Sequence, residues 1–169
     1  MNIAAFDLAI INHGWARSLD DYGVFLARGR GPAAIASTLA GVAKVAARAD
    51  LIVLEGYAYG RGQKAHQMGE TRGPVKLWLH QTRRPFVEVP PSVVKKVATG
   101  RGNAPKREVL AEAVRRLGYG GHDENEADAL WLWACAAVAY GLEGAPELPR
   151  VQREAAGAVS WPRLDSLTL

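Results

Sequence analysis

The sequence predicts one α/β domain built on a mixed five-stranded sheet that is flanked by helices. A length of 169 residues is enough for one hydrophobic core. The apolar fraction of 49% and charged fraction of 22% are typical of a globular chain. The periodic segments follow the order three strands, helix, strand, helix, strand, then helices. Strands joined by tight turns pair antiparallel, whereas strands that alternate with helices pair parallel, so the sheet is expected to be mixed.

The predicted strands are short and rich in apolar residues. They cover residues 2–8, 12–18, 22–28, 51–54 and 86–89. The first strand reaches a carboxylate at Asp7, and the turn-forming pair Asp20-Asp21 links the next two. The fourth, Leu51-Ile-Val-Leu54, is wholly apolar, as expected for a central strand that is buried on both faces. The fifth strand stops at Pro90-Pro91, because proline cannot donate to a strand ladder.

The predicted helices follow from apolar residues spaced three and four positions apart. They cover residues 32–48, 64–82, 92–98, 105–117 and 123–139. Pro32 and Pro105 fit the first turns of two of these helices. Gly69, Gly73 and Pro74 weaken the helical pattern of the second segment. We expect these elements to form a domain over residues 1–141.

Composition excludes several classes of protein. No apolar run approaches the roughly 18 residues of a membrane span, and the N-terminus lacks the basic region of a signal peptide. Cys135 is the one cysteine, which excludes a disulfide framework and a cysteine-rich zinc site. We therefore expect a cytoplasmic protein that does not enter a membrane. Residues 142–169 show weak periodicity, and we expect them to form a loosely packed C-terminal tail.

Positive charge is concentrated in the middle of the chain. Residues 56–107 contain eleven Lys or Arg against two Glu, although the whole chain carries a net charge of only +4. Tyr57, Tyr59, His66 and Trp78 lie among these charges. Such a mixture favours a groove that binds phosphates and bases. A solvated surface is the alternative interpretation of a charge run.

Three acidic residues occupy positions that favour chemistry. Asp7 and Glu55 each lie at the end of an apolar strand, and Asp128 lies where the last helix turns apolar. Helical spacing places Asn125 and Glu124 on the face of Asp128. Carboxylates that converge from distant elements repel one another unless a cation neutralises them, and oxygen ligands suit Mg²⁺. Two such ions would activate a water for phosphodiester cleavage.

Four blocks of the sequence resemble the RuvC family of Holliday-junction resolvases, especially its short phage-type members. The blocks are Ile3–Asp7, Leu51–Glu55, Gly69–Val75, and a segment from Val94-Lys95 through Gly100–Lys106 to Glu126–Leu130. The resemblance implies an RNase H-like fold of the retroviral integrase superfamily. It also implies a homodimer that acts on branched DNA.

The resemblance further implies roles for individual residues. The implied catalytic residues are Asp7, Glu55, Asp128, Lys95 and Lys106, and the three acids are the implied ligands of two Mg²⁺ ions, with Mn²⁺ as a substitute. Asn125 stands where the family has Asp or His, so it is the fourth candidate ligand. An amide oxygen binds a metal but adds no charge and cannot act as a base. Glu124 and Glu126 are the alternatives for this place.

Aromatic and basic residues are the candidates for DNA contacts. The resemblance suggests Tyr57 or Tyr59 as the residue that stacks near the junction crossover, although the matching offset falls on Ala58. The basic candidates are Arg61, Lys64, Arg72, Lys76, Arg101 and Lys106. Basic side chains bind phosphates without reading sequence and make the affinity dependent on salt.

The sequence therefore predicts a metal-dependent, structure-selective endodeoxyribonuclease that resolves four-way junctions by paired phosphodiester hydrolysis. An RNase H-like nuclease acting on hybrids or flaps would use the same metal site and is one alternative. A non-catalytic junction-binding protein is a second alternative, which Asn125 makes conceivable. A nucleotide-binding module is the third and weakest, because no phosphate-binding glycine fingerprint follows the first strand.

Overall fold

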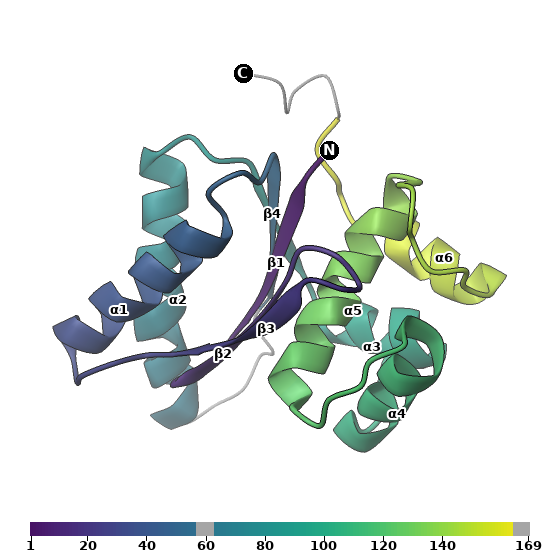
Figure 1. Ribbon diagram of the computed structural model, residues 1–169, viewed down its shortest axis with the longest axis horizontal. Helices are drawn as coiled ribbons and strands as arrows, with labels where there is room; N and C mark the ends of the chain where they lie inside the picture. The colour runs from purple at the N-terminus through teal and green to yellow at the C-terminus, as the bar shows by residue number, and fades with distance from the viewer. Residues whose placement is uncertain (57–62, 164–169) are drawn as a thin grey trace.

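The computed structural model describes residues 1–56 and 63–163, which form a five-stranded sheet between two layers of helices (Figure 1). The strands are β1 (Ile3–Leu8), β2 (Asn12–Ala16), β3 (Tyr22–Leu26), β4 (Leu51–Glu55) and β5 (Phe86–Val89). The helices are α1 (Pro32–Val45), α2 (Gln63–Gln81), α3 (Pro91–Thr99), α4 (Lys106–Leu117), α5 (Glu124–Ala139) and α6 (Arg150–Gly157). Helices α1 and α2 cover one face of the sheet, and α3 to α6 lie on the other.

The sheet is mixed, as the sequence predicts, and its strand order is β3-β2-β1-β4-β5. Strand β1 pairs antiparallel with β2, and β2 pairs antiparallel with β3. Strands β1, β4 and β5 are parallel. Phe6 lies opposite Leu54, so Asp7 and Glu55 follow at neighbouring positions, where the two central strands end.

Alternate residues of the central strands contribute to two different cores. Ala4, Phe6 and Leu8 pack with α1 and α2, whereas Ile3 and Ala5 pack with the layer that contains α5. Because successive strand side chains point to opposite faces, Asp7 shares the α5 face with Ile3 and Ala5. Glu55 shares that face by the same alternation along β4.

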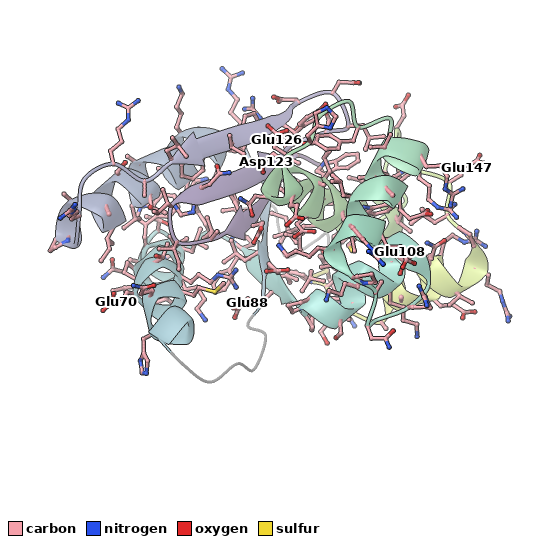
Figure 2. All side chains as sticks on the ribbon, turned by 90° about the horizontal axis from the view of Figure 1, so that it is seen from below. Glu70, Glu88, Glu108, Asp123, Glu126 and Glu147 are labelled. Atoms are coloured by element: carbon pink, nitrogen blue, oxygen red, sulfur yellow. The ribbon has the colours of Figure 1, made fainter. Side chains whose placement is uncertain are left out.

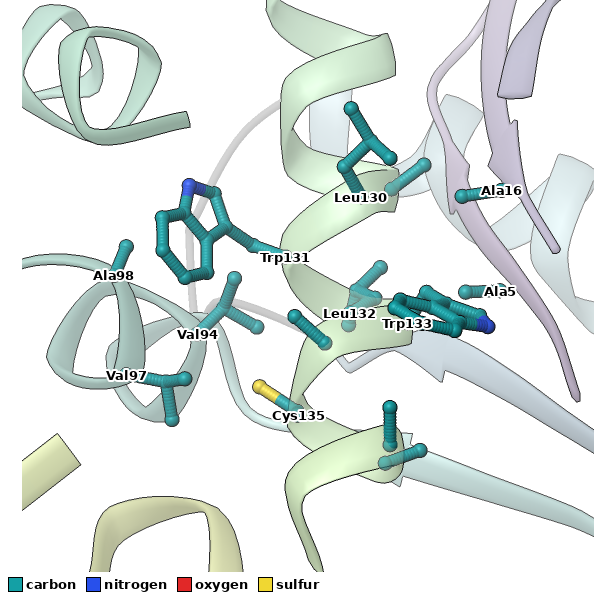
Figure 3. Packing of buried hydrophobic residues seen from close by; sticks show 14 of the residues in the cluster. Ala5, Ala16, Val94, Val97, Ala98, Leu130, Trp131, Leu132, Trp133 and Cys135 are labelled. Atoms are coloured by element: carbon teal, nitrogen blue, oxygen red, sulfur yellow. The ribbon is translucent and has the colours of Figure 1, made fainter. Parts of the chain in front are cut away.

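Helix α5 is the buried centre of the second layer. Every residue from Leu130 to Ala137 is buried, which is typical of a helix that is apolar all round. Trp131 points toward α3 and donates its indole N–H to the carbonyl of Val109 at 3.1 Å, while Trp133 lies beside Ala5 of the sheet (Figure 3). The buried helix therefore places its first turn firmly at the end of the sheet that holds Asp7 and Glu55.

The C-terminal segment differs from the expected loose tail. Helix α6 packs against α3 and α5, and Gln152 Nε2 donates to the carbonyl of Ala98 at 2.8 Å. Leu148, Ala155 and Ala156 are buried in the core. The expectation of loose packing was wrong because α6 has only 8 residues, fewer than the roughly 11 to 18 over which helical periodicity is recognised in a sequence. The domain boundary at residue 141 stays a prediction.

The predicted elements are confirmed in type and order, and they differ only at their ends. The second strand ends at Ala16, before residue 18, because the N–H groups of Arg17 and Ser18 turn to the carbonyl of Asp21 at 2.8 and 3.3 Å. Helix α1 ends at Val45, short of residue 48. In the described part of the chain, no helix combines the length and the apolar character needed to cross a membrane.

Candidate metal and active site

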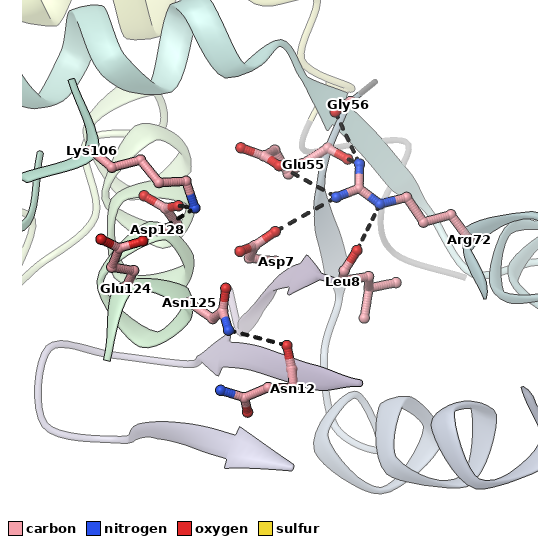
Figure 4. A network of polar contacts seen from close by, with 10 residues as sticks. All are labelled: Asp7, Leu8, Asn12, Glu55, Gly56, Arg72, Lys106, Glu124, Asn125 and Asp128. Atoms are coloured by element: carbon pink, nitrogen blue, oxygen red, sulfur yellow. Dashed lines mark hydrogen bonds and ion pairs between the residues drawn. The ribbon is translucent and has the colours of Figure 1, made fainter. Parts of the chain in front are cut away.

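Charged side chains from four elements meet where β1 and β4 end. Asp7 comes from β1, Glu55 from β4 and Asp128 from α5 (Figure 4). Lys106, the first residue of α4, lies beside Asp128. Asp7 is only 5% exposed, and the side chains of Glu55 and Asp128 are 18% and 13% exposed. Burial of three carboxylates together is costly unless cations compensate for it.

A cavity of about 180 Å³ opens between these elements. Its polar lining residues are Glu55, Lys95, Lys106 and Asp128. Pro91, Val94 and Val109 form the apolar part of its wall. The structure thus brings both predicted catalytic lysines to one cavity with two of the three predicted carboxylates. The space is sufficient for several water molecules.

Burial, with the charges of neighbouring carboxylates, raises the pKa values of two acids. Burial, followed by the charges of Glu55 and Asp128, raises the pKa of Asp7 from 3.8 to about 8, although nearby cations oppose the shift. Burial also raises the pKa of Asp128 to about 6, against the opposing effect of Lys106. A carboxyl group that retains its proton at neutral pH among oxygen ligands is a place where a divalent cation can replace that proton.

Arg72 of α2 lies on the side of the site away from α5. Its Nε donates to the carbonyl of Leu8 at 2.8 Å, and its Nη1 donates to the carbonyls of Glu55 and Gly56, both at 3.0 Å. Its Nη2 is 3.3 Å from Glu55 Oε2 and 3.6 Å from Asp7 Oδ1. The side chain is 3% exposed. The expectation that Arg72 binds a DNA phosphate was therefore wrong: this guanidinium holds together the ends of β1 and β4.

Lys106 is the cation on the opposite side of the site. Its Nζ lies 3.3 Å from Asp128 Oδ2 and 3.7 Å from Glu124 Oε2. Burial lowers the pKa of Lys106, but the negative charges of Asp128 and Asp7 outweigh this effect and raise the pKa overall. The side chain therefore stays protonated and can stabilise negative charge at the cavity.

Asn125 is oriented by the main chain of β2. Its Nδ2 donates to the carbonyl of Asn12 at 3.2 Å, which leaves its amide oxygen on the side of Asp7 (Figure 4). The alternative residue Glu126 accepts a hydrogen bond from the Tyr119 hydroxyl at 2.7 Å. This geometry favours Asn125 over Glu126 as the fourth ligand, while Glu124, 3.7 Å from Lys106 Nζ, stays an alternative.

The donor atoms that converge here are oxygens, which a hard divalent cation accepts as ligands. Among residues 1–56 and 63–163, no three acidic, histidine or cysteine side chains lie close enough to coordinate one ion together. Asp7 and Asp128 instead face the cations of Arg72 and Lys106. Carboxylate and amide oxygens suit a hard divalent cation such as Mg²⁺. The residues therefore fit such an ion by the chemistry of their donor atoms, while in this structure Asp7 and Asp128 pair with Arg72 and Lys106.

Two further predicted DNA contacts, Lys76 and Arg101, pair with acidic residues outside this cluster. Lys76 pairs with Glu88 at 3.3 Å, and Arg101 pairs with both oxygens of Glu108 at 2.8 and 2.7 Å. Figure 2 labels the two partner glutamates, Glu88 and Glu108. A phosphate would compete with these carboxylates. The predicted residues Tyr57, Tyr59 and Arg61, and the side chain of Lys64, lie outside the described part of the chain.

Some residues around the site were not singled out from sequence. Asn12 Nδ2 donates to Asp123 Oδ2 at 2.8 Å, and Gly14 lies opposite Asp7 in the sheet. A lone glycine inside a predicted strand is a signal of close backbone approach and could have drawn attention to Gly14. No sequence signal marks Tyr119, whose hydroxyl accepts a hydrogen bond from the N–H of Asp123 at 3.0 Å.

A mixed sheet of this order, with acids at the ends of adjacent central strands and a third acid on a helix, defines an RNase H-like fold. Comparison with known proteins leads specifically to RuvC. A segment of 68 residues, 40% of this chain, is 34% identical to the crossover junction endodeoxyribonuclease RuvC of Synechococcus sp. (strain WH7803). That match spans 44% of the length of the relative. No model of a protein family matches the chain.

Solved structures of Thermus thermophilus RuvC share the fold over most of their length. One aligns with a TM-score of 0.60 and 22% identity, covering 88% of this chain and 100% of the other. The other, in complex with a Holliday junction substrate, aligns with a TM-score of 0.66 and 23% identity, covering 88% and 99%. The chain therefore has the fold of RuvC, and the resemblance predicted from sequence is confirmed.

Proposed function

We propose that this protein is a metal-dependent endodeoxyribonuclease that cleaves four-way DNA junctions. The observation that carries the proposal is the convergence of Asp7, Glu55 and Asp128 from three elements at one end of the sheet. Burial, and then the charges of Glu55 and Asp128, raise the pKa of Asp7 to about 8 although Arg72 and Lys106 oppose the shift, so a bound cation would add positive charge that these carboxylates lack. The RuvC fold and the names of its similar proteins support DNA junctions as the substrate.

The proposed ligands of two divalent cations are Asp7, Glu55, Asp128 and Asn125. When bound, Mg²⁺ or Mn²⁺ supplies Lewis-acid chemistry for phosphodiester hydrolysis. Arg72 holds the carboxylate of Glu55 through a hydrogen bond of 3.3 Å and fixes the strand ends that carry the ligands. Lys106 and Lys95 line the cavity and would stabilise the negative charge that develops on the attacked phosphate.

The substrate and assembly follow from the same proposal. The basic side chains of segment 56–107, apart from the buried Arg72, would bind the DNA backbone and make the affinity strongly dependent on salt. A homodimer with two such sites would cut opposing strands of a two-fold symmetric junction. The likeness to phage-type members and action on DNA in the cytoplasm stay predictions.

Incubation of the chain with a synthetic four-way junction tests the proposed function. We expect paired nicks near the crossover in Mg²⁺ or Mn²⁺ and none in EDTA. Asp7→Asn should abolish the nicks and keep junction binding, which separates a catalytic loss from unfolding. Competitor RNA/DNA hybrids and flaps distinguish the RNase H-like alternative. Junction binding with no metal-dependent nicking by the unmodified chain would support the non-catalytic alternative instead.

A further inference from the structure

The first turn of α5 rests directly on β2, at the strand position that lies opposite Asp7. In the β1–β2 register Gly14 pairs with Asp7. A Cβ atom on Gly14 would overlap the main-chain carbonyl of Asn125 and would lie 3.0 Å from the main-chain nitrogen of Glu126. Because these obstacles are backbone atoms, no rotamer change can relieve the overlap. The helix can occupy this place only while position 14 lacks a side chain.

Asn12, two residues earlier on the same strand, ties the helix to the sheet. Its Nδ2 donates to Asp123 Oδ2 at 2.8 Å. The other oxygen of Asp123 caps α5 by accepting from the N–H groups of Asn125 and Glu126 at 2.8 and 3.2 Å. The carbonyl of Asn12 also accepts from Asn125 Nδ2 at 3.2 Å. One residue of β2 therefore holds both the cap of α5 and the amide of Asn125.

We infer that Gly14 and Asn12 are positioning residues that set the distance between the acid of β1 and the ligands carried by α5. This inference rests on the proposed function, since it concerns the metal ligands Asp7, Asn125 and Asp128. A reacting group that is misplaced by about 1 Å can cost about 100-fold in rate. Helix α5 is buried along most of its length, so a bulge at its first turn would displace the ligands and leave the remaining core in place.

The matched pair Gly14→Ala and Gly23→Ala separates positioning from general packing. Both glycines lie in strands of the same sheet, but the three atoms nearest to a Cβ on Gly23 all belong to the side-chain ring of Trp15, at 3.2 to 3.4 Å. We expect Gly14→Ala to lower junction cleavage in Mg²⁺ by about 50-fold or more. Its binding of Mn²⁺ without DNA, followed by the EPR signal of free Mn²⁺, should weaken about tenfold, and junction binding should change by less than about threefold. Gly23→Ala should match the unmodified chain in all three measurements.

Asn12→Ala is the second variant and adds no atoms to the helix–strand contact. It removes the hydrogen bond to Asp123 and keeps the main-chain carbonyl. The positioning role can therefore be tested with this variant if Gly14→Ala does not fold. We expect cleavage and Mn²⁺ affinity to fall together, by about 5- to 10-fold, with junction binding preserved. Unchanged Mn²⁺ affinity and cleavage in Asn12→Ala, or in folded Gly14→Ala, would overturn the inference.

The Mn²⁺ measurement also distinguishes this inference from the proposed function. If the unmodified chain binds Mn²⁺ but cuts no junction, the proposed nuclease activity fails, and the affinities of Gly14→Ala and Asn12→Ala still decide the positioning role. If the unmodified chain binds no Mn²⁺, the positioning of metal ligands is wrong as well.

Discussion

Nη2 of Arg72 lies 3.6 Å from Oδ1 of Asp7, so a buried guanidinium faces the most deeply buried carboxylate of the site. The same nitrogen is 3.3 Å from Oε2 of Glu55. The Nε and Nη1 atoms of the guanidinium donate hydrogen bonds to main-chain carbonyls at the strand ends. The positive charge is therefore shared between two acids. This sharing limits how far Arg72 can lower the pKa of Asp7, which burial and then the charge of Glu55 raise to about 8.

Replacement of Arg72 should destabilise the protein as well as impair catalysis. Arg72→Ala leaves two carboxylates and three carbonyls without their donor, and breaking a buried ion pair typically costs about 3–5 kcal/mol. Urea unfolding measures this loss. Arg101→Ala is the control, because Arg101 pairs with Glu108 at the surface. A loss for Arg72→Ala no greater than that of the control would contradict the structural role assigned to this guanidinium.

Asp7→Asn should stabilise the metal-free protein, increasingly so at higher pH. The folded-state pKa of Asp7 is about 8, above the ordinary value of 3.8, so ionisation of Asp7 costs stability as the pH rises from about 4 to 8. The amide carries no such cost. We expect the melting temperature of Asp7→Asn to exceed that of the unmodified chain by about 5 °C at pH 8 and to approach it near pH 4. Scanning calorimetry in EDTA measures the gap, and a gap that stays constant with pH would be inconsistent with the raised pKa.

Metal binding should displace protons from the site. Asp7 and Asp128, with pKa values of about 8 and about 6, must ionise before they can bind a cation. The apparent Mn²⁺ affinity should rise up to about tenfold per pH unit between pH 6 and 8 and should level off above pH 8. Titration calorimetry in buffers of different ionisation enthalpy counts the released protons. An affinity independent of pH across this range would show that these acids are not the ligands.

The two lysines of the cavity should contribute to the rate and little to junction binding. Lys106→Ala removes the cation beside Asp128, and we expect cleavage to fall about 100-fold, as is typical for the loss of one group that stabilises developing charge. Lys95→Ala should have a smaller effect, of about tenfold. Lys96→Ala is the matched control, because Lys96 follows on the same helix and is exposed. Equal losses in Lys95→Ala and Lys96→Ala would indicate general attraction of DNA by charge.

The carboxylates of the site could be predicted from sequence because strand geometry determines where they lie. Asp7 and Glu55 lie at the ends of two apolar strands. Each is an even number of positions from strand residues that face α5, so both side chains point to that face of the sheet. Asp128 could be predicted as the third acid because it lies beyond the acidic first turn of α5, where the helix becomes apolar. The strands and helices followed from the same periodic patterns and from the prolines at their ends.

Arg72, Gly14 and the C-terminal helix could not be placed in this way. Arg72 lies in a basic segment in which sequence alone does not distinguish a buried guanidinium from an exposed one, and its partners lie up to 64 positions away. The contact of Gly14 with α5 depends on how a helix more than a hundred residues later packs on the sheet. Helix α6 has only 8 residues, fewer than the roughly 11 to 18 over which a helical pattern is recognised in a sequence.

The most direct test of the account is the position of Mn²⁺ in crystals of the protein, located by anomalous diffraction. The account predicts a Mn²⁺ peak at the ends of β1 and β4, with oxygens of Asp7 and Asp128 among its ligands, and no peak there in crystals of Asp7→Asn. A Mn²⁺ ion bound elsewhere, or none at a concentration that supports junction cleavage, would contradict the shared cation pocket of Asp7, Glu55 and Asp128.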